Sequence, residues 1–360
     1  MENDKLAIGK YTIWVFLVVL ILVRYFTTRP VYHIGDNIRI ISSVLSDPVS
    51  FPTSQYLRLA GLKVYLPSFP KVYYGDKIVV EGVVNGDKLE SAKLIKIEDT
   101  KTFLSGFRNA IINFYENSLP QPEAGLLGGI VIGAKGALSQ TFYDQTKLAG
   151  VAHVVVASGT NVTFVVSFLF GAITLFLPRR KAIPFVILGI LLYLFVSGFD
   201  APLIRAAIMA SVAFFSQEVG RMVNTWRILF ITAALMLIYR PDWILDIGFA
   251  LSFASTVAIM LFQKKIDAWL KKVPDVIRQD FSTTLAAQIG VTPILFVIFG
   301  QFNILSPLIN VLVLWTVAPL MILGSIGGVV GLVFPSLGKI ILILTYPLLW
   351  WFVRVVKFFN

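Results

Sequence analysis

The sequence contains no cysteine and only two histidines, His33 and His153. The lack of cysteine excludes disulfide bonds and thiol chemistry, and two histidines by themselves cannot build a histidine-rich metal site. Paired carboxylates, a phosphate-binding loop and a metal-ligand cluster are also missing from the sequence pattern. The sequence therefore predicts no metal site and no cofactor.

Charged residues are scarce as well, at 14% of 360 residues, where a soluble domain has about 25%. Apolar residues make up 57%, the mean hydropathy is +0.80, and several windows exceed the roughly 18 residues that cross a bilayer. We therefore predict a polytopic α-helical membrane protein, not an enzyme, embedded in the lipid bilayer. The expected membrane-spanning stretches are 150–177, 182–197, 201–217, 224–239, 243–262, 282–298, 304–334 and 338–353.

The net charge of +11 is concentrated in short loops between apolar stretches, at residues 179–181 and 264–272. The positive-inside rule places such loops in the cytoplasm, so the charge reflects topology rather than nucleic-acid binding. Both termini are then cytoplasmic in a multi-pass plasma (inner) membrane protein. The stretch 304–334 is too long for one straight crossing, and a break at Pro307 or Pro319 would keep the C-terminus inside.

Four regions are expected: a transmembrane anchor over 1–30, a β domain over 31–99, amphipathic and re-entrant helices over 100–149, and a multi-span domain over 150–360. The β domain alternates β-branched segments with turns and has equal numbers of acidic and basic residues. Asn85-Gly86 indicates a hairpin. About five short strands predict a small extracytoplasmic barrel of the oligonucleotide/oligosaccharide-binding (OB) type.

Within the third region, Gly125, Gly129 and Gly133 recur every four residues in a short apolar segment. This spacing puts them on one helix face, where small residues allow close backbone packing. The segment is too short to span a membrane, which predicts a buried or re-entrant helix.

Polar side chains also recur at helical spacing inside the apolar stretches. One stripe follows Gly159, a glycine that we expect to interrupt the first long span. Such stripes either join helices by hydrogen bonds or line a polar lumen. The three stripes are Thr160, Thr163, Ser167, Gly171 and Thr174; then Thr284, Gln288 and Thr292; then Asn303, Ser306 and Asn310.

Arg205 lies within an otherwise apolar helix, "APLIRAAIMA". It could pair with Asp246, contact a phosphate along an aqueous path, or extend to the outer interface. Asp200, just before Ala201-Pro202, fits an N-cap. Ser158 raises the alternative of an intramembrane serine hydrolase, but His153 lies about 140° away around a helix, which disfavours a nucleophile–base pair.

Four segments, in this order, resemble motifs of the ComEC family of competence proteins, the inner-membrane channel for DNA internalisation. They are "LAGVAHVVVASGTNVTFV" (148–165), "VSGFDAPLIRAAIMAS" (196–211), "DIGFALSFASTVAI" (246–259) and "TPILFVIFGQFNILSPLINVLVL" (292–314). The anchor, β segment and amphipathic helices before them follow the family's layout, so the resemblance covers essentially the whole chain.

The resemblance implies uptake of single-stranded DNA into the cytoplasm during natural transformation. It implies as partners a DNA receptor, a separate nuclease and a cytoplasmic ATPase. Candidate channel-lining or gating residues, from the motifs and the polar stripes, are His153, Ser158, Gly159, Asn161, Thr163, Ser167, Asp200, Arg205, Asp246, Gln288, Asn303 and Asn310. The motifs also point to Phe253, Gly300 and Pro307.

Two departures from the family pattern qualify this expectation. Asn161 stands where the family often has a second histidine, and the chain ends at Asn360 without the β-lactamase-like domain of many members. We therefore expect a short form whose nuclease is another protein. Since Arg205 is one of few cations available to a DNA path, a transporter of a small solute or lipid-linked intermediate remains the alternative, ahead of the hydrolase.

Overall fold

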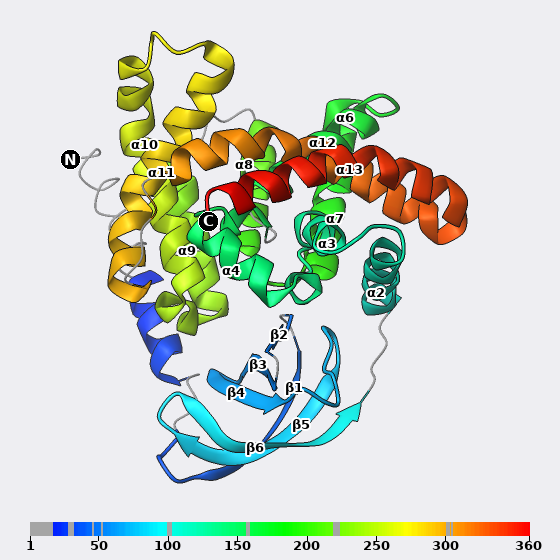
Figure 1. The fold of residues 1–360 in the computed structure, drawn as a ribbon. Helices are drawn as coiled ribbons and strands as arrows, with labels where there is room; N and C mark the ends of the chain where they lie inside the picture. Colours follow the sequence, from blue (N-terminus) through cyan, green and yellow to red (C-terminus); the bar gives the residue numbers. More distant parts are fainter. Residues whose placement is uncertain are drawn as a thin grey trace, which may run out of the picture.

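The computed structural model describes residues 17–27, 32–44, 47–51, 53–98, 103–155, 159–218, 224–299, 303 and 305–360. A small sheet lies at one end of a larger helical assembly (Figure 1). Within these described ranges, five helices are long and apolar enough to cross a membrane, as expected for a multi-span protein. They are α7 (Arg179–Ser197), α10 (Ile247–Trp269), the Arg278–Ile298 part of α11 (Asp275–Phe299), α12 (Ser306–Val333) and α13 (Pro335–Phe358).

The sheet has six strands, in the order β1-β5-β6-β4-β3-β2. The sequence pattern predicted about five short strands, and the shortest strand of the sheet is β2, with two residues. Neighbouring strands are antiparallel except β4 and β6, and Asn85 pairs with Lys88 across the expected hairpin. The strands are β1 (Asn37–Ser43), β2 (Val49–Ser50), β3 (Ser54–Leu59), β4 (Leu62–Pro67), β5 (Lys77–Asn85) and β6 (Lys88–Glu98).

The expected OB-like barrel is not closed. Among the described residues, the outer strands β1 and β2 do not pair with each other, so the sheet stays open. Strand β2 has only two residues, and prolines at positions 48 and 52 flank it. Because proline cannot donate a ladder hydrogen bond, the prolines limit the length of this edge strand.

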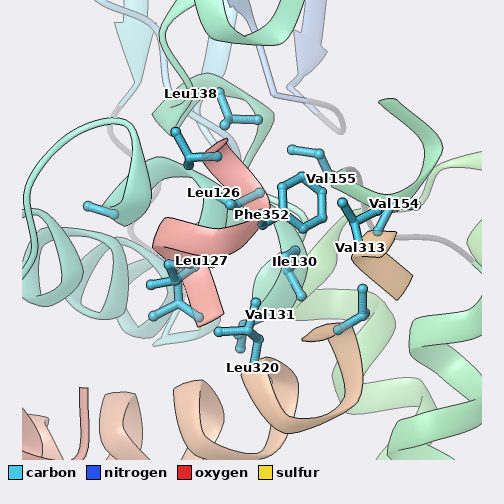
Figure 2. Packing of buried hydrophobic residues seen from close by; sticks show 14 of the residues in the cluster. Leu126, Leu127, Ile130, Val131, Leu138, Val154, Val155, Val313, Leu320 and Phe352 are labelled. Atoms are coloured by element: carbon cyan, nitrogen blue, oxygen red, sulfur yellow. The ribbon is translucent and has the colours of Figure 1, made fainter. Parts of the chain in front are cut away.

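The region after the sheet begins with α2 (Phe103–Glu116) and α3 (Glu123–Ile132), followed by η1 (Lys135–Ala137) and α4 (Gln140–Leu148). Every residue of α3 is buried. Figure 2 shows the α3 side chains Leu126, Leu127, Ile130 and Val131 packed with residues of α12 and α13, including Leu320 and Phe352. Helix α3 is therefore the centre of the helical core rather than a membrane crossing.

The glycines of α3 serve different purposes. A methyl group on Gly125 would overlap the carbonyl of Ala137, and one on Gly129 would overlap the carbonyl of Val155. Gly133 ends the helix in the left-handed conformation, with φ of 66°. Gly125 and Gly129 thus permit close backbone packing, while Gly133 allows the chain to turn.

The remaining helices are α5 (Ala152–Val155), α6 (Gly159–Thr174), α8 (Ala201–Glu218), α9 (Thr225–Tyr239) and η2 (Pro241–Leu245). Helices α6, α8 and α9 are apolar but shorter than the five candidate spans. Of the expected N-terminal anchor, the structure describes the helix Leu17–Thr27.

Helix α12 corrects the expected break within 304–334, because it runs unbroken from Ser306 to Val333. Pro307 occupies its first turn, where no backbone donor is required, and Pro319 lies inside the helix. Helices α12 and α13 pack closely, since a methyl group on Gly338 would overlap the backbone of Gly331. A tyrosine of α2 adds support, as the Tyr115 hydroxyl donates to the Gly324 carbonyl at 2.8 Å.

Candidate functional site

The first candidate region lies where α5 is followed by α6. Helix α5 ends at Val155 and α6 begins at Gly159, and Ser158 lies outside the described residues. His153 on α5 is exposed. The Val155 carbonyl lies against Gly129 of α3, so the end of α5 packs on the helical core. We call Val155, Gly159, Arg205, Phe253 and Thr256 the break site.

Arg205 of α8 is the cation of the break site. Its Nη1 donates to the Ser252 carbonyl at 2.9 Å and to the Thr256 hydroxyl, both on α10. A methyl group on Gly159 would lie 3.5 Å from Arg205 Nη2, and the guanidinium sits 5.8 Å from the Phe253 ring centre. Arg205 therefore links α8 and α10 directly beside the start of α6, and it is only partly buried.

Arg205 does not pair with Asp246, one of the three roles that the sequence left open. The Asp246 Oδ1 accepts from the Phe249 backbone and caps α10, while its Oδ2 lies 3.6 Å from Arg58 of β3. Asp246 sits at the end of its helix that faces the sheet, whereas Arg205 contacts α10 further along at Ser252 and Thr256. The aspartate thus connects α10 to the sheet.

The polar positions of α6 divide into an inner and an outer group. Asn161 is buried and donates from Nδ2 to the Ile130 carbonyl of α3 at 2.8 Å. Thr163 and Ser167 are exposed, and the Thr163 hydroxyl donates to the Gly159 carbonyl at 3.1 Å. Asn161 therefore joins α6 to α3, and the outer group leaves small polar side chains on the accessible face of α6.

The third polar stripe and Gln288 form a second cluster, which we call the clasp: Gln288, Asn303, Ser306 and Asn310. The Gln288 amide donates to the Asn303 carbonyl at 3.2 Å, and the Asn303 amide donates to the Leu148 carbonyl at 2.8 Å. The Ser306 hydroxyl donates to the Gly150 carbonyl at 3.3 Å and lies 3.4 Å from the Asn310 amide.

The clasp joins the start of α12 to the turn between α4 and α5. Gly150 has φ of 73°, and a methyl group there would overlap the Ser306 hydroxyl. Position 150 therefore requires glycine for two reasons: the positive φ, and the lack of room for a side chain. Because this turn leads directly into α5, the clasp positions one side of the break site.

Two ion pairs that the sequence did not predict lie where the sheet meets the helices. Arg108 of α2, almost fully buried, contacts Asp47 at 2.5 Å and donates to the carbonyls of Ile132 and Val196. Lys135 of η1 contacts Asp200 at 2.5 Å. Burial disfavours the charged form of Lys135, but its contact with Asp200 raises the lysine pKa above the ordinary value.

Tyr74 completes this junction. Its ring centre lies 4.7 Å from the Arg108 guanidinium, its hydroxyl donates to the Phe195 carbonyl at 3.1 Å, and burial raises its pKa. The candidate Asp200 therefore belongs to the sheet–helix junction. The sequence analysis did not single out Arg108, although it lies among the apolar residues of an amphipathic helix predicted within 100–149.

Metal binding gains no support from the geometry. Within the described ranges, no three residues of the histidine, cysteine, aspartate and glutamate types are grouped closely enough to hold an ion.

A model of the Competence protein family matches residues 130–360. The chain belongs to this family. ComE operon protein 3 of Bacillus subtilis is 27% identical over 233 residues, covering 64% of this chain and 30% of that relative. Competence protein ComA of Neisseria gonorrhoeae is 25% identical over 215 residues, covering 56% of this chain and 30% of that relative. The matched region thus spans less than a third of these relatives. No solved structure matches the chain.

The competence-family region contains the whole break site and the whole clasp. The sheet and α2 precede the matched region in the chain. Their residues Arg58, Tyr74 and Arg108 nevertheless contact residues within that region. The parts outside the matched region are therefore packed onto the competence-family helices.

Proposed function

We propose that this protein is a membrane channel that passes single-stranded DNA into the cytoplasm during natural transformation. Membership of the competence family is the observation that carries the proposal. The break site provides a location: the start of α6 lies beside Arg205, a cation suited to the phosphates of a DNA strand. The chain is proposed to act without catalysing a reaction.

The orientation follows from the placement of charge. Figure 1 shows that the α6–α7 and α10–α11 connections lie at the ends of the helices away from the sheet. Both connections are basic, with Arg179, Arg180 and Lys181 at one and Lys271 and Lys272 at the other. The positive-inside rule supports a cytoplasmic location for these ends, and we propose that the sheet lies outside, where the incoming DNA arrives.

The sheet domain is proposed to be an OB-like module that guides DNA to the helices. The other partners, also proposals, are a DNA receptor outside the cell, a separate nuclease that removes one strand, and a cytoplasmic ATPase that supplies energy. A channel that tracks a strand through loose contacts requires few cations, which is consistent with the single arginine at the break site.

Deleting the gene in its native host tests the proposal. Recovery of chromosomal markers from added DNA should fall to background and return with the plasmid-borne gene, while DNA bound at the cell surface stays unchanged. Normal transformation of the deletion strain, in cells shown to be competent, overturns the proposal. A small-solute transporter, the alternative, predicts that surface binding and DNA entry both remain and that growth on a particular solute is lost.

A further inference from the structure

The connection between α6 and α7 combines an apolar groove with a basic cluster. The groove has a volume of about 370 Å³ and is lined by Ala172, Ile173, Phe176, Leu177 and Phe185. It opens to the outside of the protein, and Phe176 and Phe185 are largely exposed. Its lining is almost wholly apolar, so it suits a hydrocarbon chain and no polar ligand.

Three basic residues follow the groove residue Leu177 in the chain, at the start of α7. Arg179, Arg180 and Lys181 begin α7, and all three are exposed. Lys181 and Phe185 are four residues apart on α7, which puts them on one face with the ammonium one turn beyond the aromatic ring. The same face continues with Leu188 and Leu192, both about half exposed. A continuous path therefore runs from positive charge to apolar surface.

The backbone at the start of α7 adds to the attraction for an anion. Pro178, its N-cap residue, supplies no side-chain hydrogen bond to the first turn. Backbone donors at a helix start attract an anion, and the arginine guanidinium groups can each hold two phosphate oxygens.

We propose that this groove and the cluster Arg179–Arg180–Lys181 bind one anionic phospholipid of the surrounding membrane. The phosphate lies beside Lys181 and the start of α7, where the two arginines add positive charge, and an acyl chain fills the groove between α6 and α7. Basic pockets between membrane helices bind anionic headgroups in this way. Because the basic connections define the cytoplasmic end of the helices, the lipid belongs to the cytoplasmic leaflet. The inference requires membrane insertion but not DNA as the cargo.

Site-specific fluorescence quenching tests the proposal. Since the chain has no cysteine, Leu177→Cys gives a single labelling point in the groove. The labelled full chain is placed in phosphatidylcholine vesicles that contain either brominated phosphatidylglycerol or brominated phosphatidylcholine. We expect the anionic lipid to quench at a mole fraction at least about fivefold lower, as one basic group near an anionic surface already contributes a factor of this order. Equal quenching by the two lipids overturns the proposal.

Two variants in the Leu177→Cys background distinguish the contribution of the basic cluster to lipid binding from that of the groove. Arg179→Gln, Arg180→Gln and Lys181→Gln together remove the headgroup contacts, and Ala172→Phe fills the groove while leaving every charge in place. Both should abolish the preference for the anionic lipid, and retention of the preference in either variant contradicts the proposal. If the triple variant inserts poorly into the vesicles, the result for Ala172→Phe alone tests the proposal.

Two controls exclude a general surface-charge effect. Lys264→Gln, Lys265→Gln and Lys271→Gln change the net charge equally at the other basic connection, and the preference should survive. A label at Leu235→Cys, on an exposed face of α9, should report no preference. Loss of preference in the lysine variant, or an equal preference at Leu235→Cys, shows nonspecific attraction and overturns a defined site.

Discussion

Arg108 and Asp47 form an ion pair that joins helix α2 to a residue 61 positions earlier, with Nη2 and Oδ2 2.5 Å apart. The arginine also donates to the carbonyls of Ile132, at the end of α3, and Val196, near the end of α7. One buried side chain therefore holds together the sheet segment and three helices.

Asp47→Ala should destabilise the protein markedly, because it leaves the Arg108 charge buried without its carboxylate. The expected cost is about 3–5 kcal/mol, read as a lower midpoint of thermal unfolding in detergent. Arg39→Ala is the matched control: it breaks the exposed pair with Glu81 and should cost less than about 1 kcal/mol. Similar midpoints for the two variants would show that the buried pair does not hold the junction.

Arg205→Ala should reduce transformation at least about tenfold while the amount of protein in the membrane stays unchanged. One charge-assisted hydrogen bond to a passing phosphate corresponds to about 1.5–3 kcal/mol, enough for such a loss. Arg240→Ala, which removes an exposed arginine beside Asp242, serves as control and should transform normally. If Arg205→Ala instead removes the protein from the membrane, the arginine is a link between α8 and α10 and nothing more.

Gly150→Ala should destabilise the clasp by about 1–3 kcal/mol, since the new methyl group overlaps Ser306 and occupies a left-handed conformation. The additional change Ser306→Ala should restore part of the loss, because it removes the overlapping hydroxyl. Gly171→Ala has open space around it and lies within α6, so it should be neutral or slightly stabilising. Thermal midpoints of the three variants give the measurement, and equal effects of Gly150→Ala and Gly171→Ala would contradict the clasp.

Asn161→Leu should lower stability by about 1–3 kcal/mol through loss of the hydrogen bond to Ile130. Transformation should then fall only in proportion to the amount of folded protein. Thr163→Val, on the accessible face of the same helix, should leave stability unchanged. A stable Asn161→Leu protein with strongly reduced transformation would instead place the amide on the DNA path.

Much of the fold followed from local patterns. The stretches expected at 201–217 and 224–239 form helices shorter than the five candidate spans. Long apolar runs predicted those five spans, and Asn85-Gly86 predicted the β5–β6 hairpin. These features depend on neighbouring residues alone, so the sequence carries them directly. Pro319 misled the prediction of α12, because tertiary packing of a helix against α3 and α13 outweighs one missing backbone hydrogen bond.

The sequence by itself predicted a mostly helical chain with several apolar helices long enough to span a membrane, and it showed which polar residues lie inside the apolar stretches. Only the tertiary structure decided the partners of those residues. Asp246 meets Arg58 of the sheet rather than Arg205, Asp200 meets Lys135, and Arg108 meets Asp47. Helical spacing fixes which face a side chain occupies, but the residue opposite that face comes from distant segments whose approach depends on the packing of the whole core.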